Sequence, residues 1–155
     1  MKAPLPALFV GHGSPMNTLE DNANSRAWRD WGRRLPRPQA ILAISAHWET
    51  LGVAVGSGPS PNTLHDFSGF PKALETLKYP APGSPTLARR VARLLEPETV
   101  ELDPRRGLDH GVWSVLAHLF PGADIPVVQL GLDQRRDAAA HFALGQRLRP
   151  LRDDG

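Results

Sequence analysis

The sequence contains no cysteine, and this absence narrows the chemistry available to the chain. Disulfides, cysteine-ligated zinc sites and thiol nucleophiles are all excluded. Any metal site must therefore be built from histidine, aspartate or glutamate, and the chain has 6 histidines. Three other signatures are also missing: the Gly-x-Ser-x-Gly nucleophile elbow, the Walker A phosphate loop and the Gly-x-Gly-x-x-Gly dinucleotide loop.

The sequence also has little excess of charge of either sign and no long hydrophobic run. The formal net charge is only +2, and basic residues alternate with acidic ones, so we expect no nucleic-acid partner. No apolar stretch approaches the about 20 residues of a membrane helix, and the N-terminus lacks a signal-peptide pattern. We therefore expect no membrane partner and a cytoplasmic location. With 155 residues, 41% hydrophobic and 22% charged, the chain is predicted to form one domain over residues 1–155.

The chain alternates between strand-like and helix-like segments. Strands are predicted at residues 7–10, 40–45, 53–55, 99–102 and 125–130, and helices at residues 22–34, 85–95, 112–119 and 138–151. Residues 56–85 are rich in proline and glycine and are predicted to be mostly loop. Residues 40–45 are almost wholly apolar, which is typical of a strand covered on both faces. The pattern predicts an α/β fold with a mainly parallel sheet flanked by helices.

Two predicted strands each lead into a histidine. His12 follows the first strand and lies between Gly11 and Gly13, which allow a sharp turn close to a ligand. His47 follows the strand at residues 40–45. In open α/β sheets, ligands and catalytic groups gather at the carboxyl edge of the strands. Two imidazoles delivered to that edge suggest a metal site, although each could also be a structural residue.

Two further histidines lie in loops and are candidates for acid–base work. His110 lies in the glycine-bounded segment 107–111, and His65 lies in the loop before Asp66. A histidine titrates near neutral pH and can take or give a proton. Beside them, Asp109 either orients an imidazole or caps the following helix, and Trp48 either walls a pocket or fills the core.

Taken together, the motifs resemble those of the class III extradiol ring-cleavage dioxygenases, in the 4,5-DOPA dioxygenase branch of the LigB-like superfamily. They run in the family's order along nearly the whole chain: Gly11-His12-Gly13-Ser14-Pro15-Met16, Ser45-Ala46-His47-Trp48, His65-Asp66-Phe67 with Gly69-Phe70-Pro71, Tyr79-Pro80-Ala81-Pro82-Gly83, and Asp109-His110-Gly111 with Trp113. The set is far more specific than any one motif.

This resemblance implies a non-haem Fe(II) site, with Zn(II) as the alternative metal. His12 and His47 match two metal ligands of the family, His110 its catalytic acid/base, and His65 a second active-site histidine. We also expect Ser14 and Trp48, which belong to the motifs that contain His12 and His47, to contact the substrate. The implied substrates are O₂ and a catechol resembling DOPA, whose ring is cleaved beside the diol.

The resemblance also bears on the extent of the chain. Members of the family are longer, and a further metal ligand, a histidine in an Asn-Val-Val-His type of loop, lies beyond the point at which this chain stops. We therefore expect residues 1–155 to be the N-terminal portion of a catalytic domain, truncated at the C-terminus, and to be inactive in this form unless another chain completes the site. An unfinished sheet edge favours association, so a homo-oligomer is expected.

Two other functions remain as alternatives. Tetrapyrrole metal chelatases also open with a strand and a His-Gly-Ser type of segment and bind metal through histidines. The second alternative is a relative that binds metal without catalysing a reaction. Tetrapyrrole titration would reveal the first, and a metal site without turnover would reveal the second.

Overall fold

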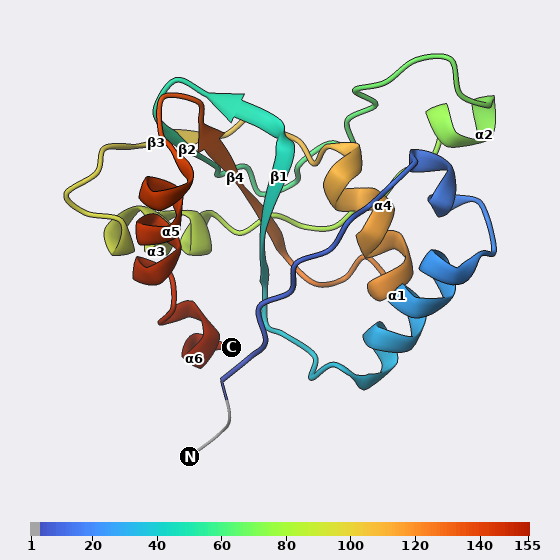
Figure 1. Ribbon diagram of the computed structural model, residues 1–155, viewed down its shortest axis with the longest axis horizontal. Helices are drawn as coiled ribbons and strands as arrows, with labels where there is room; N and C mark the ends of the chain where they lie inside the picture. Colours follow the sequence, from blue (N-terminus) through green and yellow to red (C-terminus); the bar gives the residue numbers. More distant parts are fainter. Residues whose placement is uncertain (1–3) are drawn as a thin grey trace.

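The computed structural model describes residues 4–155 and has an α/β architecture (Figure 1). Its sheet has four strands in the order β1-β4-β2-β3: β1 (Ile41–Thr50), β4 (Val127–Asp133), β2 (Val53–Gly56) and β3 (Val100–Asp103). The pairs β1/β4 and β2/β3 are parallel, whereas β2 and β4 are antiparallel. The predicted fold class, a mainly parallel sheet flanked by helices, is confirmed.

Helices cover both faces of this sheet (Figure 1). On one face lie α1 (Ala23–Arg34) and α4 (His110–Leu119), where Trp28 and Trp113 are buried together with Val127 of β4. On the other face lie α3 (Pro85–Leu94) and α5 (Ala138–Arg147), packed on the next residue of β4, Val128. Side chains alternate along a strand, so the nearly continuous apolar run of β4 serves both cores.

Three short helices complete the fold: η1 (Pro15–Thr18), α2 (Lys72–Glu75) and α6 (Leu151–Asp154). The predicted helix at residues 138–151 is divided in two, because Pro150 lacks the N–H that would continue α5. Among residues 4–155, no helix is both long and apolar enough to cross a membrane.

The predicted strand at residues 7–10 is wrong. Leu8 and Phe9 are exposed, Phe9 completely, and no strand among residues 4–155 pairs with this segment. An apolar run becomes a strand only where a neighbouring strand satisfies its backbone groups. Here Leu5 N–H instead donates to the carbonyl oxygen of Arg152, and the run remains irregular up to His12.

The second strand is longer than predicted. β1 continues to Thr50, because Glu49 and Thr50 pair with Leu132 and Asp133 of β4 after a register shift that begins at Ile44. His47 therefore lies within β1, in its irregular stretch, and not beyond its end. Such irregularities re-aim side chains next to functional sites.

Candidate metal centre

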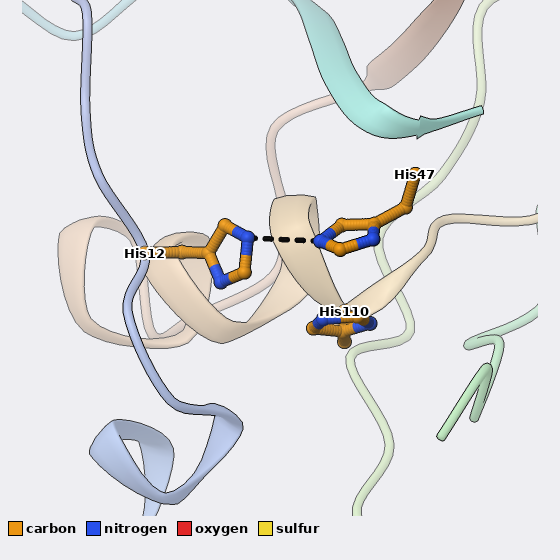
Figure 2. Close-up of side chains that lie close together, drawn as sticks. All are labelled: His12, His47 and His110. Carbon is orange, nitrogen blue, oxygen red and sulfur yellow. Dashed lines mark hydrogen bonds between the residues drawn. The ribbon is translucent and has the colours of Figure 1, made fainter. Parts of the chain in front are cut away.

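Three histidines from three separate segments meet at one end of the sheet. His12 comes from the loop before η1, His47 from the irregular stretch of β1, and His110 from the first turn of α4 (Figure 2). Each offers a ring nitrogen, and these three atoms lie within 4.8 Å of one another. The structure thus brings the two predicted metal ligands together with the predicted acid/base residue.

The rings are arranged so that nitrogens face one another. Nε2 of His12 lies 2.9 Å from Nε2 of His47. The ring of His110 lies 4.0 Å from that of His47 and 5.1 Å from that of His12, measured between centroids. Metal–imidazole bonds are about 2.0–2.1 Å long, so two nitrogens at this separation are within reach of a single ion.

The position of His12 depends on a tight local turn. Gly13 has φ +60°, a left-handed conformation that residues with a Cβ rarely adopt. Asn17, which is buried, donates from Nδ2 to the carbonyl oxygen of His12. Ser14 then caps η1, its Oγ accepting the N–H of Met16. The sequence Gly-His-Gly-Ser thereby turns the chain and fixes the backbone that carries the imidazole.

His47 is held through its backbone by a buried carboxylate. Its N–H donates to Ser45 Oγ, and that hydroxyl donates to Oδ1 of Asp109 over 2.7 Å. Gly111 leaves the space for this arrangement, since a Cβ there would lie 2.6 Å from Ser45 Oγ and 2.9 Å from Cδ2 of His47. A residue larger than glycine at position 111 would push His47 away.

The carboxylate of Asp109 is fully buried and fully satisfied. Besides the Ser45 hydroxyl, it accepts hydrogen bonds from Gln129 Nε2 and from Arg106, whose NH2 group lies 2.7 Å from Oδ2. The guanidinium of Arg106 also stacks on Trp48, 4.5 Å from the ring centroid. A buried charge is tolerated only with such partners, so this network ties β1, β4 and the start of α4 into one unit.

His110 has a partner of its own. Oδ1 of Asp66 accepts two hydrogen bonds from this residue, one from Nδ1 at 2.8 Å and one from the backbone N–H at 3.1 Å. Burial acts to raise the pKa of Asp66, but the hydrogen bonds from His110 outweigh it, and the pKa lies below its ordinary value. Asp66 therefore stays ionised at neutral pH.

The surroundings of His12 favour its neutral imidazole. Burial lowers the pKa of His12 below its ordinary value of 6.5, and the neighbouring His110 and His47 lower it further. The lone pair of His12 is therefore free at neutral pH. Neutral imidazole suits zinc, copper, iron and nickel, so these residues fit a transition-metal ion.

The other predicted site residues lie outside this cluster. Nε2 of His65 contacts the carbonyl oxygen of Leu77, and Phe67 lies between the rings of His65 and His110, at 5.9 and 5.5 Å from them. Ser14 caps η1, and Trp48 is buried beneath Arg106. Their contact with substrate stays a prediction.

Sequence reasoning placed His110 in the same site as His12 and His47, through the family resemblance, but it missed one contribution to this centre. It gave no role to Asp66, which lies 44 residues away from its partner His110 along the chain. Asp109 was considered as a helix cap or as a group that orients an imidazole. It makes no side-chain capping bond to α4 and acts through Ser45 on His47.

Comparison with known proteins agrees with this geometry. Relatives named 4,5-DOPA dioxygenase extradiol match from Escherichia coli K12, with 55% identity over 97% of this chain, and from Beta vulgaris, with 44% over 95%. The matches cover 56% and 57% of those proteins, so the chain spans about half the length of these curated relatives. A crystal structure of an uncharacterized Escherichia coli K12 protein aligns with TM-score 0.76 and 48% identity, over 92% of this chain and 53% of that one.

A family match covers almost the whole chain. Residues 6–155 match the family described as the catalytic LigB subunit of aromatic ring-opening dioxygenase. Together with the relatives and the clustered histidines, this match leaves one assignment: the chain belongs to the LigB family of aromatic ring-opening dioxygenases.

Proposed function

We propose that the protein is a non-haem, metal-dependent extradiol dioxygenase that opens the ring of a catechol resembling DOPA with O₂. The observation that carries the proposal is the cluster of His12, His47 and His110, whose ring nitrogens lie within 4.8 Å of one another. The names of the relatives support the reaction class and the substrate class.

In this proposal His12 and His47 hold the metal, which we expect to be Fe(II), with Zn(II) as the alternative. Their facing Nε2 atoms support this role, and so does the lowered pKa of His12. The chemistry that Fe(II) supplies when bound is a set of open positions for both diol oxygens and for O₂. Both atoms of O₂ enter the product as the ring carbon–carbon bond beside the diol breaks.

His110 is the proposed acid/base residue. Its Nδ1 is engaged by Asp66, so Nε2 is the ring nitrogen left to take a hydroxyl proton from the diol. His65 is proposed as a second active-site histidine, held by the Leu77 carbonyl oxygen. Ser14 and Trp48 are proposed to contact the substrate, Ser14 from the same loop as His12.

A catechol-cleavage assay tests the proposal. The purified chain is loaded anaerobically with Fe(II) and mixed with L-DOPA in air, while oxygen uptake and the absorbance of ring-opened product are followed. Turnover would support the proposal, and we expect His12→Ala, His47→Ala and His110→Ala to abolish it. His141→Ala is the control, because His141 lies on α5 outside the cluster. Stoichiometric metal without any turnover would instead favour the non-catalytic relative.

The chelatase alternative is not favoured, because the family match and the named relatives are dioxygenases.

Two further proposals concern the association of the chain and its location in the cell. We propose that copies of the chain associate through the free edge of β1, which pairs only with β4 among residues 4–155. We also keep the cytoplasm as the proposed location, which fractionation of the source cells tests.

A further inference from the structure

The start of α4 is capped in an unusual way. Asp109 stands at the N-cap position, but its side chain makes no capping hydrogen bond because the buried network engages it. The N–H of His110, the first residue of the helix, would then lack a partner. Asp66, from a distant loop, supplies it by accepting this N–H over 3.1 Å.

The same oxygen of Asp66 fixes the imidazole of His110. Oδ1 lies 2.8 Å from Nδ1, and an ionised carboxylate can only accept hydrogen bonds. Nδ1 must therefore carry a proton. In a neutral imidazole the other nitrogen is then an acceptor, so the free lone pair of His110 is on Nε2. That nitrogen is the one left to serve the cluster with His12 and His47.

We infer that Asp66 is a positioning residue that holds His110 in the Nδ1–H tautomer and so leaves the unprotonated Nε2 for the metal centre. The functional meaning of this inference rests on the proposed function, since a base that takes a diol proton needs a free lone pair. The tautomer itself does not depend on turnover. Hydrogen bonds to the second ring nitrogen commonly set which nitrogen reacts.

The other histidines of the chain provide internal controls. Nε2 of His65 lies 2.9 Å from the Leu77 carbonyl oxygen, and Nε2 of His118 lies 2.8 Å from that of Asn17. A carbonyl oxygen only accepts, so these two residues are expected as Nε2–H tautomers. The structure thus predicts opposite tautomers for His110 and for these two histidines.

Nitrogen-15 NMR of the imidazole rings, in metal-free protein at pH 8, tests this inference. In the unmodified chain, His110 is expected as the Nδ1–H tautomer, with His65 and His118 as Nε2–H. Asp66→Ala removes the acceptor and is expected to shift His110 to the Nε2–H form without changing the other two. Asp66→Asn keeps an acceptor oxygen and is expected to preserve the original tautomer of His110.

Two results would overturn the inference. One is a proton on Nε2 of His110 in the unmodified chain, which decides the matter even if Asp66→Ala fails to fold. The other is an unchanged Nδ1–H tautomer in a folded Asp66→Ala variant. Because no metal or catechol is present, a failure of the dioxygenase proposal would leave these spectra unaffected, and the two hypotheses are tested separately.

Discussion

Nε2 of His12 lies 2.9 Å from Nε2 of His47, although the two residues are 35 positions apart in the chain. This approach joins an irregular N-terminal loop to β1, a strand at the edge of the sheet. Two local features make this approach possible: Gly13, which follows His12, has a left-handed backbone conformation, and the pairing of β1 with β4 shifts register around His47.

Gly111→Ala should weaken metal binding. The added Cβ would lie 2.6 Å from Ser45 Oγ and 2.9 Å from Cδ2 of His47, so the hydroxyl and the imidazole must move. Loss of a supporting contact of this kind typically lowers metal affinity about 10–100-fold, and zinc titration calorimetry measures it. Gly145→Ala in α5 is the matched control, since its Cβ meets nothing within 4 Å. That change should add roughly 0.5–1 kcal/mol to the free energy of unfolding. Equal zinc affinities in the two variants would contradict the account.

Arg106→Met should destabilise the fold. The substitution removes the cationic partner of Asp109 and leaves a buried carboxylate, 1% exposed, without a compensating charge. Breaking a buried pair from one side costs about 3–5 kcal/mol, and urea unfolding measures this loss. Arg26→Met is the comparison, because Arg26 pairs with Asp21 at the surface, where the side chains are 59% and 65% exposed. That change should cost less than about 1 kcal/mol. Similar losses in the two variants would show that the Asp109 network is not a structural support.

The stability of the metal-free protein should depend on His12 at mildly acidic pH. Burial and the two neighbouring histidines lower the pKa of His12 below 6.5 in the folded chain. The unfolded chain therefore binds a proton first, so stability is full above pH 6.5 and falls as the pH drops toward the folded pKa. Urea unfolding with a chelator, between pH 7.5 and 5.5, should show a steeper loss for the unmodified chain than for His12→Gln. Parallel curves would argue against a His12 that burial and its neighbouring histidines hold in the neutral form.

Association through β1 should be visible in solution. Among residues 4–155, β1 pairs with a strand on one side only, with β4, and Ile44 on this strand is 53% exposed. Exposed edges of this kind favour pairing with another chain. The mass measured by light scattering should rise with concentration and fall in Ile44→Lys. Leu51→Lys, outside the strand at a residue 76% exposed, should leave it unchanged. A concentration-independent monomer would refute the proposed association.

Much of the fold was predictable from local patterns. The helix predicted from residue 85 begins there as α3, because Ser84 and Pro85 form a typical helix start and capping preferences are local. The apolar run of β4 likewise identified a buried strand. The run at residues 7–10 had the same appearance and formed no strand, since pairing depends on a neighbour that a local pattern does not reveal.

The metal centre was predictable in part. Glycines around His12 and the position of His47 after an apolar run pointed to both residues. The extension of β1 to Thr50 was missed because its pairing with β4 resumes only after a shift in register. The contact between Asp66 and His110 spans 44 residues, and no spacing rule identifies a partner at that distance.

Metal content tests the central claim most directly, namely that His12 and His47 hold one ion beside His110. The chain is loaded anaerobically with Fe(II) or with Zn(II), and unbound metal is removed by gel filtration. The metal content per chain is then measured by inductively coupled plasma mass spectrometry. We predict one ion per chain for the unmodified protein and loss of that ion in both His12→Ala and His47→Ala, with His141→Ala unaffected. Unchanged metal content in the two cluster variants would contradict the account.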